Sequence, residues 1–156
     1  MNTASINFAA RWETLAYKLS IAVLVLSGLA QMPLFKRYYV SEIPGLAWTA
    51  DFYFNHILHY TAAAVLLFII FKWTATLVRM KKPGPGLTVS GWIRIGLFLL
   101  IIFTGFLRAL KNLQDFYFSP MATTSIIWIH LAAGALLGIV AAYSYFAGKA
   151  YFKVQD

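Results

Sequence analysis

Four long runs of apolar residues constrain the fold of this chain more than any other feature of its sequence. The runs cover roughly residues 12–32, 52–73, 91–110 and 123–147. Each is close to the length of about 20 residues that an α-helix needs to cross a bilayer. Only 12% of the residues are charged, about half of what a soluble domain carries. We therefore expect an all-α integral membrane protein, a four-transmembrane-helix up-down bundle in which residues 1–156 form a single membrane domain in contact with lipid.

The absence of cysteine limits the cofactors that the chain can hold. With no thiol in the sequence, disulfides, thiolate zinc sites, cysteine-ligated iron–sulfur clusters and thioether-attached haem are excluded. The net charge of +8 does not indicate nucleic-acid binding, because the basic residues flank the apolar runs.

The distribution of basic residues predicts how the chain lies in the membrane. Four spans place both termini on the same side. If that side is the inner one, nine of the 13 basic residues lie inside, and four lie outside: Lys36, Arg37, Arg108 and Lys111. By the positive-inside rule we expect both termini to be cytoplasmic and the protein to be a multi-pass protein of the inner, cytoplasmic membrane.

Two histidines lie at matching depths inside the second and fourth runs. His59 and His130 are each about seven residues from the outer end of their run, which at ~1.5 Å per residue is roughly 10 Å below the outer surface. Two imidazoles at equal depth on two helices can bind one iron from opposite sides. We therefore expect His59 and His130 to be the axial ligands of one haem.

Small residues follow both histidines at the third and fourth positions, which share the histidine's face of a helix. They are Ala62 and Ala63 after His59, and Ala133 and Gly134 after His130. Small side chains leave room for a flat, bulky group beside the imidazole. Ala63 and Gly134 are accordingly predicted to pack against the haem.

Each histidine also has a simpler interpretation. A neutral imidazole can join two spans by a hydrogen bond, although an ionisable side chain inside a bilayer favours a functional site. Zinc is not favoured, because two histidines without a nearby carboxylate form an incomplete ligand set. His56 lies one turn nearer the outside than His59, and both cannot be axial to one iron. The preference for His59 depends partly on the small residues that follow it.

Two further residues are candidates for polar contacts near the outer surface. His56 is predicted either to contact a haem propionate or a quinone head group or to be an ordinary interfacial histidine. Arg108 is predicted either to pair with a propionate or to extend to the interface. Gly28 and Gly105 are expected to form flat surfaces for a helix or for the macrocycle. Arg11 and Glu13 predict an ion pair where the first span enters the membrane.

Short motifs in all four spans carry a resemblance to a known family. They are Ser27-Gly28-Leu29, His56-Ile57-Leu58-His59-Tyr60, Thr104-Gly105-Phe106 and, in the last span, Trp128-Ile129-His130-Leu131-Ala132-Ala133-Gly134. With them the chain resembles the four-helix b-type cytochrome subunits of membrane-bound formate dehydrogenases and, more loosely, those of nickel–iron hydrogenases.

The resemblance implies ligands for two haems, one near each face of the membrane. It assigns His59 and His130 to the outer haem. The inner pair is expected early in the first span and about two-thirds along the fourth, where this chain has Tyr17 and Ser144. Because neither is a histidine, we expect a single haem b in the outer half of the bilayer.

These features together predict a membrane electron-transfer subunit. We expect it to relay electrons between the quinone pool and an extracytoplasmic iron–sulfur or cytochrome subunit docked on the outer loops, residues 33–51 and 111–121. Catalysis would then lie elsewhere in the complex. Two alternatives stay open: a haem-free structural anchor of a larger complex, and a stand-alone b-type cytochrome that oxidises quinol.

Overall fold

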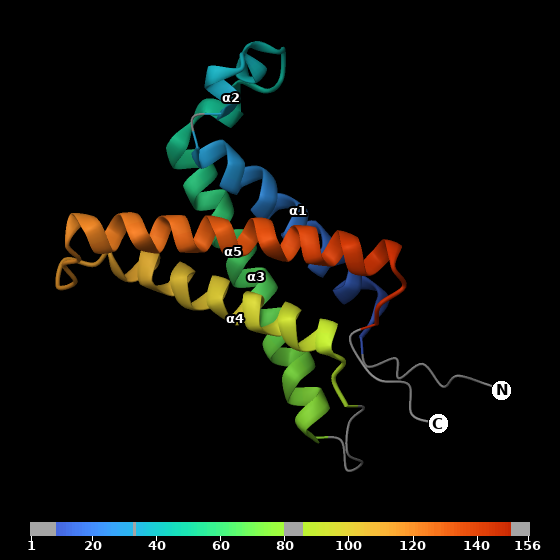
Figure 1. The fold of residues 1–156 in the computed structure, drawn as a ribbon. Helices are drawn as coiled ribbons and strands as arrows, with labels where there is room; N and C mark the ends of the chain where they lie inside the picture. The colour runs from blue at the N-terminus through green and yellow to red at the C-terminus, as the bar shows by residue number, and fades with distance from the viewer. Residues whose placement is uncertain (1–8, 33, 80–85, 151–156) are drawn as a thin grey trace. The chain divides into compact units, whose positions relative to one another are not determined.

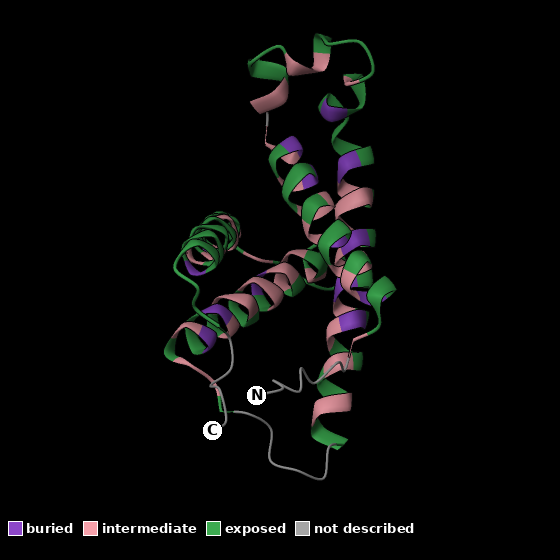
Figure 2. Ribbon diagram, turned by 90° about the vertical axis from the view of Figure 1, so that its right-hand side faces the viewer, coloured by how far each residue is buried: buried purple, intermediate pink, exposed green. Residues whose placement is uncertain are grey.

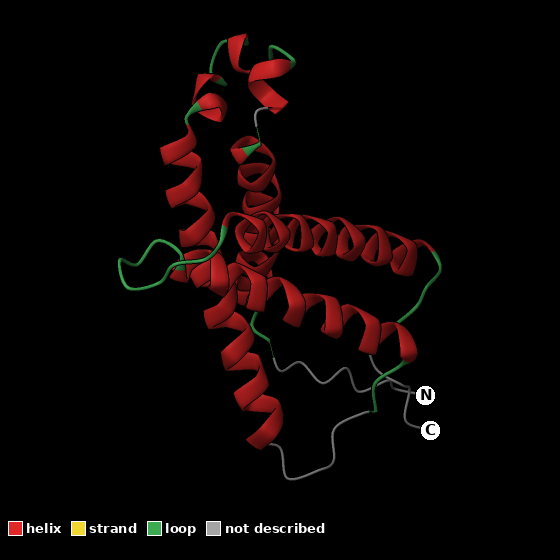
Figure 3. Ribbon diagram, turned by 60° about the vertical axis from the view of Figure 1, so that its left-hand side comes forward, coloured by secondary structure: helices red, strands yellow, loops and turns green. Residues whose placement is uncertain are grey.

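The computed structural model describes residues 9–32, 34–79 and 86–150. Its four long helices are α1 (Arg11–Gln31), α3 (Phe52–Arg79), α4 (Val89–Leu110) and α5 (Pro120–Phe146), shown in Figure 1. All four are long and apolar enough to cross a membrane, and no β-strand occurs within the described ranges (Figure 3). The predicted fold class, an all-α membrane protein with four spanning helices, is confirmed.

The chain divides into two compact units, Met1–Pro83 and Gly84–Asp156. In the first unit α1 packs along α3, and in the second α4 packs along α5. Each unit is a helical hairpin, and we call them the first and the second hairpin. That residues 1–156 form one membrane domain stays a prediction.

Two helices begin before the apolar runs that predicted them, because polar side chains cap their first turns. Thr88 Oγ1 accepts a hydrogen bond from the backbone N–H of Gly91 at 2.9 Å, so α4 begins at Val89. Ser119 Oγ accepts one from the N–H of Ala122 at 3.2 Å. Proline in the first turn is compatible with a helix start, since its missing N–H has no partner there, and α5 begins three residues earlier than its apolar run.

The loop between α1 and α3 is held against the first turn of α3. It contains the short helices α2 (Leu34–Arg37), η1 (Val40–Glu42) and η2 (Ala47–Ala50). Asn55 is fully buried, and its amide donates to the backbone oxygens of Trp48 at 2.9 Å and Asp51 at 2.7 Å. This loop, which was predicted to lie outside and to receive a partner subunit, is therefore fixed to the helix that carries His59.

Small and polar side chains are buried along the contact within each hairpin (Figure 2). In the first hairpin they include Ser20, Ser27 and Ala30 of α1 and Ala62 of α3, and the larger Leu66 and Ile69 of α3 are buried beside them. In the second they are Gly91, Arg94 and Thr104 of α4 and Ala133 and Ser144 of α5.

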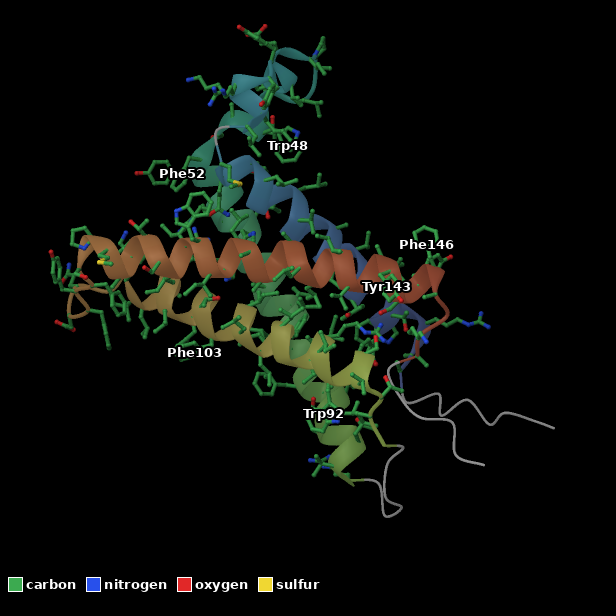
Figure 4. The ribbon with its side chains drawn as sticks, viewed as in Figure 1. Trp48, Phe52, Trp92, Phe103, Tyr143 and Phe146 are labelled. Carbon is green, nitrogen blue, oxygen red and sulfur yellow. The ribbon has the colours of Figure 1, made fainter. Side chains whose placement is uncertain are left out.

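Large apolar side chains lie on the outside of the helices. Trp92 and Phe103 of α4 and Phe146 of α5 are 64%, 60% and 85% exposed (Figure 4). Membrane helices pack through small residues and hydrogen bonds, and lipid covers their apolar side chains. The distribution of side chains therefore agrees with a multi-pass protein in a bilayer.

Candidate functional site

His59 is held by two residues of the neighbouring helix in the first hairpin. Its Nδ1 atom lies 3.0 Å from Ser27 Oγ. A Cβ added to the next residue, Gly28, would lie 3.4 Å from His59 Cε1, so the imidazole lies over this glycine at a distance that an alanine would fill. The serine thus binds one edge of the ring, and the ring faces the glycine of α1.

The hydrogen bonds around Ser27 favour one tautomer of His59. Ser27 Oγ donates its single hydrogen to the backbone oxygen of Val23 at 2.6 Å. With that hydrogen used, the tautomer that fits the 3.0 Å contact is the one in which Nδ1–H of His59 donates to Ser27 Oγ. In a neutral imidazole Nε2 then has the lone pair, which is the atom and the electron pair that bind a metal.

His130 is held in the same way in the second hairpin. Its Nδ1 atom lies 2.8 Å from Thr104 Oγ1, and that hydroxyl donates to the backbone oxygen of Leu100 at 2.7 Å. By the same reasoning the tautomer that fits this contact is the one in which Nδ1–H of His130 donates to the threonine and Nε2 has the lone pair. A Cβ added to Gly105 would lie 3.3 Å from His130 Cε1, which is tighter than most real contacts.

The structure shows what the glycines and alanines near the two histidines pack against. Gly28 and Gly105 were expected to face a helix or the macrocycle, and each contacts an imidazole. Ala62 and Ala133, at the third position after each histidine, are 7% and 2% exposed and pack within the hairpins.

The residues at the fourth position after each histidine lie toward the outside of their helices. Ala63 is half-buried and Gly134 is exposed, and a Cβ added to Gly134 would meet no atom within 4 Å. Their predicted packing against a haem stays a prediction.

His56 lies among aromatic rings of its own helix. Its imidazole stacks on Phe52, with ring centroids 5.6 Å apart, and contacts Tyr60 at 4.3 Å. Its Nδ1 atom is buried and has no hydrogen-bond partner in the part of the chain that is described. A buried ring nitrogen without a partner is costly, and this makes His56 a candidate for contact with a further group.

Arg108 lies one turn beyond Thr104 on α4 and is half-buried. It follows, by four residues, the threonine that contacts His130. Arg108 is therefore a basic residue, among those predicted to lie outside, that is close along α4 to the contact with His130.

The two positions that the family resemblance assigns to an inner haem are in contact with other side chains. The ring of Tyr17 packs on that of Trp73, with centroids 5.2 Å apart. Ser144 is 2% exposed, and its hydroxyl lies 3.0 Å from that of Ser90.

Glu13 does not form the local ion pair that the sequence predicted. It is 1% exposed and accepts hydrogen bonds from Lys72 Nζ and from Trp73 Nε1, the latter at 2.9 Å. Since both donors belong to α3, this ion pair joins the two helices of the first hairpin. Glu13 thus pairs with Lys72 across the hairpin instead of with Arg11.

Sequence reasoning did not identify Ser27 and Thr104 as partners of the histidines. The available signal was a hydroxyl residue followed by glycine in the span that precedes each histidine span. The chain as a whole matches no protein-family model, no curated protein and no solved structure.

Proposed function

We propose that the chain is a membrane electron-transfer subunit in which His59 and His130 hold one haem b. The observation that carries this proposal is the matching support of the two histidines. Each donates Nδ1–H to a hydroxyl of the neighbouring helix, and each packs against a glycine. Two ligands of one iron would need the same support at both histidines.

The donor set fits a haem iron. Histidines that bind metals commonly donate their other ring N–H to a protein oxygen, which fixes the tautomer and the ring orientation. Ser27 and Thr104 supply that oxygen here. When bound, the haem would supply one-electron redox chemistry, and two imidazole ligands would leave no open position for a substrate.

Residues near the outer end of the helices suit the polar edge of such a site. Arg108 lies one turn beyond Thr104, the residue that contacts His130, and we assign it to a haem propionate. His56 has a buried ring nitrogen without a described partner, and we assign it to a propionate or to a quinone head group.

The residues at the inner end of the helices agree with a single haem rather than two. The positions expected for a second pair of imidazole ligands hold Tyr17 and Ser144, neither of which is a histidine, and these residues contact Trp73 and Ser90. The proposed stoichiometry is therefore one haem per chain, in the outer half of the membrane.

The proposed orientation follows from charge. Nine of the 13 basic residues lie on the side of the termini, so this side is assigned to the cytoplasm and the membrane to the inner membrane. The partners are then the quinone pool and an extracytoplasmic iron–sulfur or cytochrome subunit on the outer loops. The reaction catalysed by the complex would take place in another subunit.

A haem-free structural anchor is the second candidate function, and one observation favours it. The bonds from His59 to Ser27 and from His130 to Thr104 join helices of the same hairpin. Such bonds stabilise membrane hairpins without any cofactor. The two functions differ in whether the purified chain has a Soret band.

Haem quantitation on the purified membrane complex tests the proposal. A pyridine haemochrome assay with protein quantitation is expected to give one haem per chain. His59→Ala and His130→Ala should each abolish the bis-histidine spectrum, whereas the matched control His56→Ala should retain it. A wild-type chain that binds no haem, even when haem is supplied, would leave the anchor as the function.

A further inference from the structure

The first hairpin has two polar contacts between its helices, at two levels along their length. The outer contact joins Ser27 to His59 at 3.0 Å. The second contact joins Glu13 to Trp73 Nε1 at 2.9 Å. Along the sequence, Glu13 and Ser27 of α1 are as far apart as His59 and Trp73 of α3, so the two contacts are equally spaced on both helices.

The second hairpin has two contacts at the same spacing. The outer contact joins Thr104 to His130 at 2.8 Å. The second contact joins the hydroxyls of Ser90 and Ser144 at 3.0 Å. The separation along the sequence from Ser90 to Thr104 on α4 equals that from His130 to Ser144 on α5, and both equal the separation in the first hairpin.

The hairpins therefore correspond position by position at both levels, although the side chains at the second level differ in chemistry. At the histidine level the chemistry is the same in both: a hydroxyl acceptor, a glycine after it, and an imidazole donor. Since helix register alone does not require the same side chains, this identity points to a shared task of Ser27 and Thr104.

We propose that Ser27 and Thr104 are equivalent positioning residues for the two iron ligands. Each accepts Nδ1–H from its histidine and thereby fixes the tautomer in which Nε2 binds the iron. This inference rests on the proposed haem site and adds the residues that orient its ligands and set its potential.

The hydroxyl acceptors have an electronic consequence. A hydrogen bond from Nδ1–H to an oxygen increases the electron donation of the imidazole to the metal. Stronger donation stabilises the oxidised iron and lowers the reduction potential, which hydrogen bonding and ligand character set in haem proteins. Loss of either hydroxyl should therefore shift the midpoint potential to more positive values.

Variants at Thr104 separate the hydroxyl from the volume of the side chain. Thr104→Val keeps the shape and removes the acceptor, and Thr104→Ser keeps the acceptor. Ser27→Ala removes the equivalent acceptor in the first hairpin. The matched control is Thr61→Ala on α3, because Thr61 is exposed and its hydroxyl donates to the oxygen of Ile57 in its own helix.

Two measurements test whether Ser27 and Thr104 position the histidines. In haem-free protein, ¹⁵N chemical shifts of the imidazoles are expected to show Nδ1–H for His59 and His130, and a mixture of tautomers for the affected histidine in Thr104→Val and Ser27→Ala. In haem-loaded protein, a redox titration should give a more positive midpoint potential for these two variants. Thr104→Ser and Thr61→Ala should match the wild type in both measurements.

The outcomes separate this inference from the proposed function. If the wild type binds haem and Thr104→Val and Ser27→Ala keep its tautomers and its potential, the positioning role is overturned while the haem site stands. Loss of haem in Thr104→Val that Thr104→Ser does not recover also overturns it, whereas recovery by Thr104→Ser supports it. A wild type that binds no haem overturns both.

Discussion

Replacing Gly105 with alanine tests the contact between α4 and His130 without depending on any cofactor. The added Cβ would lie 3.3 Å from His130 Cε1, so the ring has to move by a few tenths of an ångström. Such a movement also strains the 2.8 Å contact between His130 Nδ1 and Thr104 Oγ1. The contact with α4 therefore leaves little room for a methyl group.

The expected loss of stability follows from a comparison with Gly96, a second glycine of the same helix. A Cβ added to Gly96 would meet no atom within 4 Å. Both substitutions gain about 1 kcal/mol of helix propensity, and this gain cancels between them. Overpacking at Gly105 costs about 1–3 kcal/mol. The variant Gly105→Ala should accordingly be less stable than Gly96→Ala by about 1–3 kcal/mol.

The assay is reversible unfolding of the purified chain in mixed micelles, followed by circular dichroism. Gly28→Ala belongs in the same series, since its Cβ would lie at an ordinary 3.4 Å from His59 Cε1. The expected order of stability is Gly96→Ala, then Gly28→Ala, then Gly105→Ala. Equal stability of the Gly96 and Gly105 variants would refute the close packing of the imidazole on α4.

Three other predictions concern packing, the outer loop and orientation. Ile69→Ala, at a side chain 2% exposed, should destabilise the chain by roughly 2–5 kcal/mol, and Phe71→Ala, at one 71% exposed, by much less; equal losses in micelle unfolding would contradict the assigned packing face. Asn55→Asp should lower stability by about 1–3 kcal/mol and speed proteolysis of residues 38–50, because the amide that donates to two loop oxygens is lost; an unchanged cleavage rate would argue against that attachment. Because the chain has no cysteine, an impermeant maleimide should label Tyr117→Cys from the outer side of intact cells and leave Lys149→Cys unlabelled, and the reverse pattern would invert the proposed topology.

The sequence predicted the spans well because their signal is local. Length and apolar composition identify a spanning helix without any knowledge of its neighbours. The starts of α4 and α5 were less accurate, since they depend on the capping hydroxyls of Thr88 and Ser119. Capping depends on backbone geometry at a single residue, which average hydropathy does not describe.

The partners of the histidines could not be predicted in the same way. Large apolar side chains occur on lipid-facing as well as packed parts of the spanning helices, so hydrophobicity alone does not indicate which face packs against a neighbour. Ser27 is 32 residues from His59, and Thr104 is 26 residues from His130. Such contacts depend on how each helix is rotated about its axis. The same rotation placed Glu13 beside Lys72 instead of Arg11.

The remaining polar groups indicate where further contacts should be sought. Within the described residues, His59, His130 and Glu13 each have a hydrogen-bond partner in their own hairpin. The buried side-chain atoms without one are Asn55 Oδ1 and His56 Nδ1, which belong to adjacent residues in the first turns of α3. Because an unsatisfied buried polar atom costs about 1–3 kcal/mol, a group that supplied hydrogen bonds at this end of α3 would be stabilised there. The first turns of α3 are therefore the part of the described chain at which a hydrogen-bonding group would relieve the most buried polar atoms.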